Sequence, residues 1–105
     1  MIDSDKILKA IKQTVKGRFP EAKVILYGSR ARGTSKPDSD WDLLILLNRD
    51  KITPEIEESI SYPLYDLEIE FGEVISPMIY SESEWTNKYV VTPFYKNIMR
   101  EGRQI

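Results

Sequence analysis

The chain has 105 residues, of which 41% are hydrophobic and 30% charged, with a formal net charge of −2. This length fits one domain, residues 1–105, with a single core, and the composition is that of a globular protein. The small negative charge argues against strong binding to a nucleic-acid backbone. Histidine and cysteine are absent, which excludes Ser-His and Cys-His nucleophilic sites and the usual zinc sites. A bound metal should therefore be magnesium, calcium or manganese, which prefer oxygen ligands.

No apolar run approaches the roughly 20 residues that a membrane helix needs. The N-terminal segment MIDSDKILKAIK is amphipathic and lacks the apolar stretch of a signal peptide. We therefore expect a cytoplasmic protein without membrane contact.

A first helix is predicted by apolar residues that recur at helical spacing from Ile7 to Val15. Asp3 or Ser4 is available as its N-cap, and residues 17–20, which begin with glycine and end with proline, should stop it.

Two apolar strands follow, at residues 23–27 (KVILY) and 41–47 (WDLLILL). Mostly β-branched or large apolar side chains make the first a buried strand, which ends at a glycine. The residues between them, 33–40 (GTSKPDSD), are dense in turn formers and predict an exposed connection. A helix carrying Ile56 and Ile60 should follow the second strand.

The second half of the chain is less regular in pattern. Pro63 is expected to end or kink the preceding helix, because proline lacks an N–H donor. Residues 66–71 (DLEIEF) alternate in polarity and would suit a strand, although helix is the preferred interpretation. Residues 74–80 form a third strand, in which Pro77 is acceptable only at an edge or bulge. A capped helical turn at SESEW and a final helix over residues 93–100 close the chain.

Aromatic side chains are frequent near the C-terminus. Core packing is the preferred interpretation, and a docking face the alternative. Two further tyrosines are also assigned to packing. The first group is Trp85, Tyr89, Phe94 and Tyr95, and the further pair is Tyr62 and Tyr65.

The glycine that ends the first strand begins a candidate anion-binding loop. The backbone N–H groups of Gly28 and Ser29 and the serine hydroxyl can face an anion at the mouth of the sheet. Arg30 and Arg32 can bond phosphate oxygens bidentately, and Lys36 is close enough in sequence to approach a nucleotide. The alternative is an ordinary turn with solvated basic side chains.

An acidic pair, Asp40 and Asp42, stands at the start of the second apolar strand. Residues two apart on a strand point to the same side, so Trp41 should point away, towards the core. Two carboxylates about 6 Å apart repel by roughly 3 kcal/mol at an effective dielectric of 20. Near a buried sheet such a pair is expected to bind a cation, the alternative being two solvated carboxylates.

The segment GSRARGTSKPDSDWDLLIL resembles the signature of the DNA polymerase β-like nucleotidyltransferase superfamily, and is most similar to the minimal nucleotidyltransferases. The resemblance implies an α/β (α+β) palm with a mixed three- to four-stranded sheet and helices mainly on one face. It also implies Asp40 and Asp42 as ligands of Mg²⁺, with Mn²⁺ as an alternative, and Gly28 and Ser29 as the triphosphate cradle. Arg30 and Arg32 would be supporting contacts.

Such enzymes normally use a third carboxylate on a neighbouring strand, and alignment places Ser76 at that position. Glu73 is the preferred substitute as a third catalytic residue, ahead of Glu68 and Glu70. For each glutamate taken by itself, a solvated surface position is the preferred interpretation and a catalytic role the alternative.

Two functions follow from these residues. The first is a nucleotidyltransferase that moves a nucleoside monophosphate, expected to be AMP, from ATP or another nucleoside triphosphate to an acceptor hydroxyl. The second is a catalytically weak or inactive nucleotide-binding or antitoxin-like module that docks on a partner protein. Because the chain has no room for an acceptor-binding domain, a homodimer or a helical, toxin-like partner is expected for either.

Overall fold

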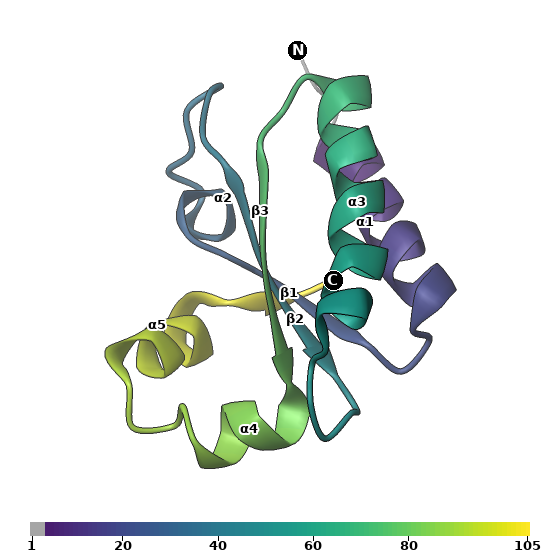
Figure 1. Ribbon diagram of the computed structural model, residues 1–105. Helices are drawn as coiled ribbons and strands as arrows, with labels where there is room; N and C mark the ends of the chain where they lie inside the picture. The colour runs from purple at the N-terminus through teal and green to yellow at the C-terminus, as the bar shows by residue number, and fades with distance from the viewer. Residues whose placement is uncertain (1–3) are drawn as a thin grey trace.

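A mixed four-stranded sheet forms the centre of the molecule in a computed structural model that describes residues 4–105 (Figure 1). The strand order is β3-β2-β1-β4. β1 is antiparallel to both β2 and β4, whereas β2 and β3 run parallel. The predicted mixed sheet is thus confirmed. The strands are β1 (Lys23–Tyr27), β2 (Trp41–Leu47), β3 (Ile75–Ser81) and β4 (Arg103–Gln104).

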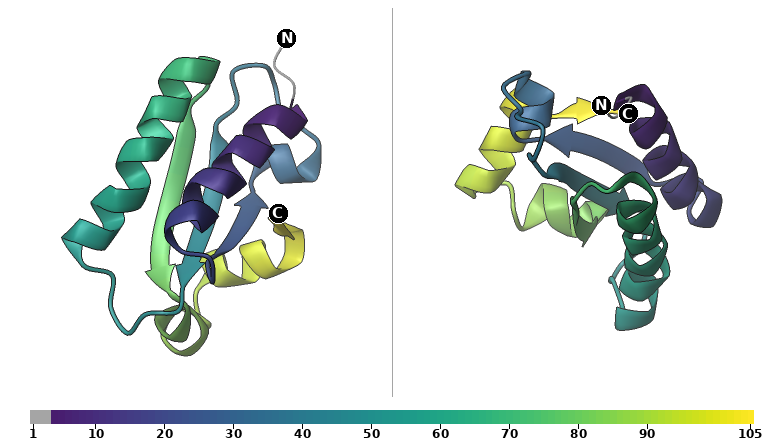
Figure 2. Two further views of the ribbon diagram at one scale, coloured as in Figure 1. Left: turned by 90° about the vertical axis from the view of Figure 1, so that its right-hand side faces the viewer. Right: turned by 90° about the horizontal axis from the view of Figure 1, so that it is seen from above.

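Helices cover both faces of this sheet, with the two long ones together on one face. α1 and α3 lie side by side there, and the short helices α4 and α5 lie on the opposite face (Figure 2). This arrangement is the α+β palm expected from the sequence. The helices are α1 (Ser4–Arg18), α2 (Ser29–Arg32), α3 (Pro54–Phe71), α4 (Glu82–Asn87) and α5 (Pro93–Glu101).

The pleat of the strands divides the apolar side chains between two cores. On β1 and β2 the residues that face α1 and α3 are fully buried, and they include Val24, Leu26 and Ile45. Their neighbours along each strand face α4 and α5, where Leu44 and Leu46 join the C-terminal aromatic cluster. Core packing is confirmed for that cluster, which consists of Trp85 with Tyr80, Tyr89, Phe94 and Tyr95.

Pro63 was expected either to end or to kink its helix, and it does not end it. α3 continues through it to Phe71, which confirms the helical interpretation of residues 66–71. Ile60 and Leu64 flank the proline and are buried against α1, and this packing outweighs the missing N–H donor. Pro77 lies on β3, an edge strand, as predicted.

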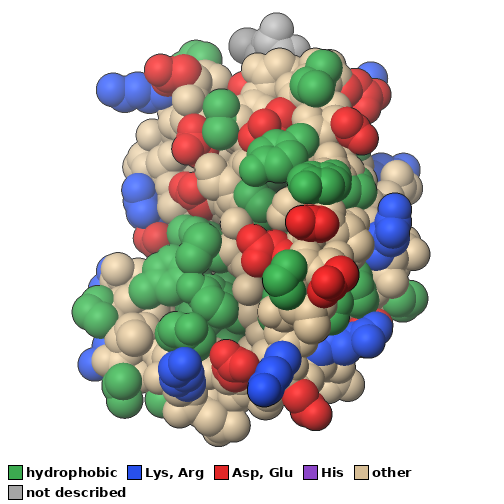
Figure 3. Space-filling model, viewed as in Figure 1, with side chains coloured by type: hydrophobic (Ala, Val, Ile, Leu, Met, Phe, Trp, Pro, Cys, Tyr) green, Lys and Arg blue, Asp and Glu red, His purple; other side chains and the backbone are tan. Residues whose placement is uncertain are grey.

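The packing assigned to Tyr62 and Tyr65 is wrong, because both side chains are more than half exposed. They lie on the outward side of α3, and Ile60 and Leu64 occupy its buried side. Figure 3 shows hydrophobic side chains interspersed with acidic ones over this helix.

Caps fix the ends of the later helices. The Ser81 hydroxyl accepts from the Glu84 N–H at 3.1 Å and begins α4, and the Thr92 hydroxyl does the same for Tyr95 at α5. Asp3, an expected N-cap of α1, lies outside the described residues, and α1 begins at Ser4. No described helix is long and apolar enough to cross a membrane.

Candidate active site

The ends of three strands meet at one edge of the sheet. β1 ends at Tyr27, which pairs directly with Asp42 near the start of the antiparallel strand β2. On the other side of Asp42, the parallel strand β3 contributes Ser76 in register. The glycine loop, the acidic residue and the position of the expected third carboxylate are therefore neighbours, although they lie far apart in the sequence.

Gly28 touches the carboxylate of Asp42. The glycine has φ 76° and ψ −159°, a conformation that residues with a Cβ rarely adopt. A Cβ added at this position would collide with Asp42 Oδ2 and would lie 3.3 Å from Asp42 Cγ. The predicted loop and the predicted acidic pair thus form one site, and glycine is required where they meet.

Asp40 joins the same site from the residue before β2. Its Oδ2 accepts a hydrogen bond from the Ser76 hydroxyl at 3.4 Å, and Ser76 lies beside Asp42 in register. Partial burial raises the pKa of Asp42, the negative charge of Asp40 raises it further, and Arg32 opposes both effects. Trp41, between the two acids, is buried in the core as predicted.

The donor set of Asp40, Asp42 and the Ser76 hydroxyl fits a hard cation. All the ligating atoms are oxygens, which Mg²⁺ and Mn²⁺ prefer, and the repulsion between the two carboxylates would be relieved by a positive ion. Within residues 4–105 no group of three histidine, cysteine or acidic side chains could hold a metal ion. A cation here would need further oxygen ligands from water or from a substrate.

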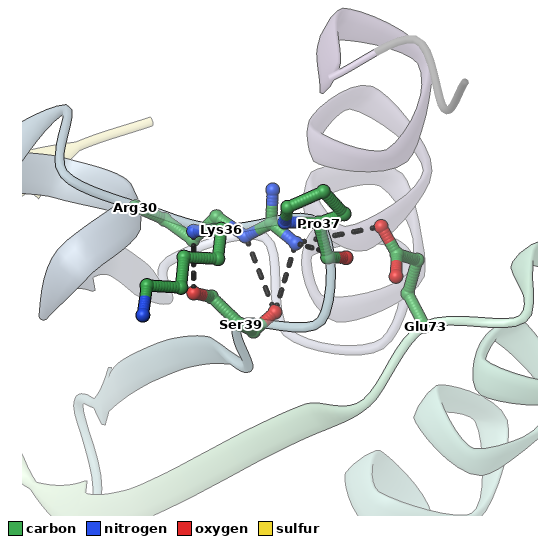
Figure 4. A network of polar contacts seen from close by, with 5 residues as sticks. All are labelled: Arg30, Lys36, Pro37, Ser39 and Glu73. Atoms are coloured by element: carbon green, nitrogen blue, oxygen red, sulfur yellow. Dashed lines mark hydrogen bonds and ion pairs between the residues drawn. The ribbon is translucent and has the colours of Figure 1, made fainter.

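Arg30 ties the loop before β2 to the sheet. Its Nη2 and Nε atoms donate to the Ser39 carbonyl at 2.8 and 3.3 Å, and Nη2 reaches the Pro37 carbonyl at 3.4 Å (Figure 4). The guanidinium also lies 4.3 Å from the centre of the Trp41 ring, a cation–π contact. The Nε and Nη2 donors of Arg30 are thus used within the protein, and the side chain holds the loop in place.

The glutamates expected as a third carboxylate have other partners. Glu73 forms an ion pair with Arg30 at 3.5 Å, with both side chains almost buried (Figure 4). Glu68 accepts from the Ile75 N–H at 2.7 Å and so anchors the start of β3, and Glu70 is exposed. None of them joins Asp40 and Asp42 in a metal-binding group, and a catalytic role for Glu73 stays a prediction.

The remaining predicted contacts lie around the loop. Ser29 begins α2, a single turn of four residues. The backbone N–H groups of Ala31 and Arg32 in this turn donate to the Gly28 carbonyl. Lys36 lies in the exposed loop, where its backbone N–H donates to the Ser39 hydroxyl at 2.8 Å. Arg32 points to the end of α5, where its Nη1 is 3.0 and 3.2 Å from the two carboxylate oxygens of Glu101.

Glu101 was not among the predicted site residues. It also accepts from the Gly28 N–H at 3.4 Å, so it holds two groups of the candidate loop. The hydrogen bond from Arg32 is the main reason why the pKa of Glu101 is lowered. No local sequence pattern announces this residue, because its partners lie at the other end of the chain and only the fold brings α5 to α2.

Tyr27 closes the site on the side of α5. Its ring packs edge-on against Phe94, with 5.5 Å between the ring centres. Burial, and to a smaller extent the charge of Asp42, raises the Tyr27 pKa to about 12. The phenol is therefore a neutral group near Asp42 at physiological pH.

A single sheet edge that carries a glycine turn and two adjacent carboxylates is the arrangement expected of a nucleotidyltransferase palm. The family model described as "Nucleotidyltransferase domain" matches residues 5–103. The chain belongs to this family.

Among curated proteins, the chain is 33% identical over 98 residues to "Putative protein adenylyltransferase MJ0604" of Methanocaldococcus jannaschii, covering 93% of this chain and 89% of that protein. Two crystal structures share the fold at 17% identity. One is a mutant of the toxin–antitoxin MntA–HpeT (TM-score 0.60, 100% of this chain and 72% of the other). The second is a toxin–antitoxin with AMP-PNP (TM-score 0.62), and the match covers 98% of this chain and 72% of the other.

Proposed function

We propose that this protein transfers a nucleoside monophosphate, preferentially AMP, from a magnesium–nucleoside triphosphate to an acceptor hydroxyl. The observation that carries the proposal is the contact between Gly28 and the Asp42 carboxylate, with Asp40 on the same side. This contact supports the proposal because the turn that would bind phosphate lies directly beside the two carboxylates that would hold the metal. The similarity to a protein described as an adenylyltransferase supports the choice of AMP.

In this reaction the acceptor oxygen forms a bond to the α-phosphorus while the bond from that phosphorus to the bridging β-phosphate oxygen breaks. Pyrophosphate leaves, and the hydroxyl proton passes to water or to a carboxylate at the site. Asp40 and Asp42 would hold Mg²⁺ or Mn²⁺. The ion supplies charge neutralisation and polarisation of the α-phosphate when bound.

The loop residues would orient the triphosphate. The Ser29 hydroxyl and the Gly28 backbone are placed at the end of β1, beside the acidic pair. Arg32 and Lys36 add positive charge, and the Nε and Nη2 atoms of Arg32 lie outside its contact with Glu101. Arg30 acts through the loop, which it fixes to Trp41 and Ser39.

The proposal is tested by incubating the protein with each α-labelled nucleoside triphosphate and magnesium, alone and with a helical partner protein. We expect label on an acceptor together with pyrophosphate, with ATP preferred and with both lost in excess chelator. Label that appears equally with and without a divalent cation would contradict the proposed metal role. Binding of triphosphate without any pyrophosphate release would contradict catalysis.

A second candidate function is a nucleotide-binding module that acts by docking. Ser76 favours it, because this hydroxyl stands in register with Asp42 where the related enzymes are expected to have a carboxylate. Such a protein would bind the nucleoside triphosphate but would transfer the nucleoside monophosphate slowly.

Ser76→Asp separates the two functions. Restoring a third carboxylate beside Asp42 should raise the magnesium-dependent transfer rate by about tenfold, because it adds a metal ligand. It should also lower the melting temperature without metal, since three carboxylates repel one another. Gln13→Glu, on the exposed side of α1, is the control for an added acid. An unchanged rate with unchanged metal dependence would rule out Ser76 as the reason for weak transfer.

We also propose that a second protein, either a helical partner or a second copy of this chain, supplies acceptor recognition. Both similar crystal structures are of a toxin–antitoxin, which supports a partner over a free-standing enzyme.

A further inference from the structure

The contact between Glu101 and Arg32 lies directly beside the acidic pair. Glu101 ends α5 and its side chain is only 17% exposed, whereas Arg32 lies on a one-turn helix and is 48% exposed. The carboxylate takes two hydrogen bonds from the single atom Arg32 Nη1 and a third from the Gly28 N–H. The more fixed member of the ion pair is thus the glutamate.

Arg32 has a second possible partner in the same place. Glu101, which holds Arg32, also accepts from the Gly28 N–H, and Gly28 lies against the Asp42 carboxylate. The guanidinium is therefore close to the acidic pair, and two acids together attract a nearby guanidinium more strongly than one surface acid does. An arginine side chain has several rotatable bonds, so a free Arg32 could bend to the acidic pair. That contact would occupy the carboxylate oxygens and neutralise the charge that binds a cation.

The contact with Glu101 occupies only part of the Arg32 guanidinium. Both of its hydrogen bonds to the guanidinium come from Nη1, and neither Nε nor Nη2 takes part. A guanidinium offers five N–H donors in a fixed plane, so one edge can stay on Glu101 while other donors face a ligand. The same carboxylate also ties the Gly28 amide to α5.

We propose that Glu101 is a positioning residue that holds Arg32 away from the Asp40–Asp42 pair and thereby keeps these carboxylates open for the divalent cation. This inference rests on the proposed function, in which the pair binds that cation. Glu101 acts through Arg32 and makes no contact with the metal itself. Its loss should therefore weaken cation binding only while Arg32 is present.

The test is Mn²⁺ binding to the nucleotide-free protein, measured as free Mn²⁺ by electron paramagnetic resonance. Glu101→Met keeps the length of the side chain but removes both acceptor oxygens, and we expect Mn²⁺ to bind about tenfold more weakly. Glu101→Gln retains one carbonyl acceptor for Arg32 Nη1 and should restore binding to within about threefold. In Arg32→Ala and in Arg32→Ala/Glu101→Met, Mn²⁺ should bind at least as tightly as in the wild type.

Glu82→Met is the matched control, because Glu82 pairs with Lys23 at the start of α4 and lies outside the site. Wild-type affinity in Glu101→Met would overturn the proposal, as would a double variant that binds as weakly as Glu101→Met alone. Circular dichroism identifies a variant that does not fold, and Glu101→Gln combined with Arg32→Ala then supplies the comparison. If Asp42→Asn leaves wild-type Mn²⁺ binding unchanged, it is the proposed metal site that fails.

Discussion

Asp42→Asn should lower nucleotidyl transfer by about a thousandfold while leaving the protein folded. The change keeps the shape of the side chain but removes the charge that would hold the cation next to the α-phosphate. Loss of one such electrostatic contact typically costs about 10²–10³ in rate, and here it would also weaken the metal site. Label transfer from α-labelled ATP, at saturating magnesium and with an acceptor found in the nucleotide screen, measures the effect.

The same variant should be at least as stable as the wild type. Burial and the neighbouring Asp40 raise the folded-state pKa of Asp42, so the charged form is less favourable in the folded protein than in the unfolded chain. Without metal, the wild type should lose stability as the pH rises from the ordinary aspartate pKa through this raised value. Asp42→Asn should not show that loss in thermal melts between acidic and neutral pH.

Asp50→Asn is the control, because Asp50 is exposed in the turn beyond the other end of β2. It should keep full transfer. Equal labelling by the wild type and Asp42→Asn would remove the carboxylate from the mechanism, and a clear drop in the metal-free melting temperature of Asp42→Asn would mean that the carboxylate stabilises the fold.

β1 and β2 could be predicted from local sequence signals, whereas the mixed sheet was expected from the family resemblance. β1 and β2 are continuous apolar runs bounded by glycine or polar turns, and their ends place Gly28 near Asp42. The capped turn predicted at SESEW is also local, because its N-cap Ser81 is of a residue type that favours this position. α2 and β4 were not predicted, since a single turn and a two-residue strand are too short to have a periodicity.

The partners of the charged side chains could not be predicted in the same way. Arg30 looked like a phosphate ligand, yet it bonds loop carbonyls and packs on Trp41, which requires the loop to fold back over the sheet. The ion pair of Arg30 with Glu73, the expected third carboxylate, likewise requires this fold. Glu101 is placed against Gly28 only by the docking of α5. Such contacts depend on side-chain directions that no local pattern contains.

Gly28→Ala should reduce transfer by about a hundredfold, mainly by moving Asp42. At φ 76° and ψ −159° an alanine is strained, at a cost of about 1–3 kcal/mol. Its Cβ would also collide with Asp42 Oδ2, and the end of that side chain can give way more easily than the backbone. The carboxylate would then leave the position in which it faces the loop, and displacements of about 1 Å can cost a hundredfold in rate.

Gly72→Ala is the control for a substitution at positive φ without the collision. Gly72 also has a positive φ, 67°, but a Cβ added to it would meet nothing within 4 Å, and it ends α3. Both variants should melt at lower temperature than the wild type, whereas only Gly28→Ala should lose transfer and bind Mn²⁺ more weakly. If the two variants lost stability equally and both kept wild-type transfer, the glycine loop and Asp42 would not work as one site. If Gly28→Ala alone lost transfer, by more than its loss of stability explains, the glycine loop and Asp42 would act as one site.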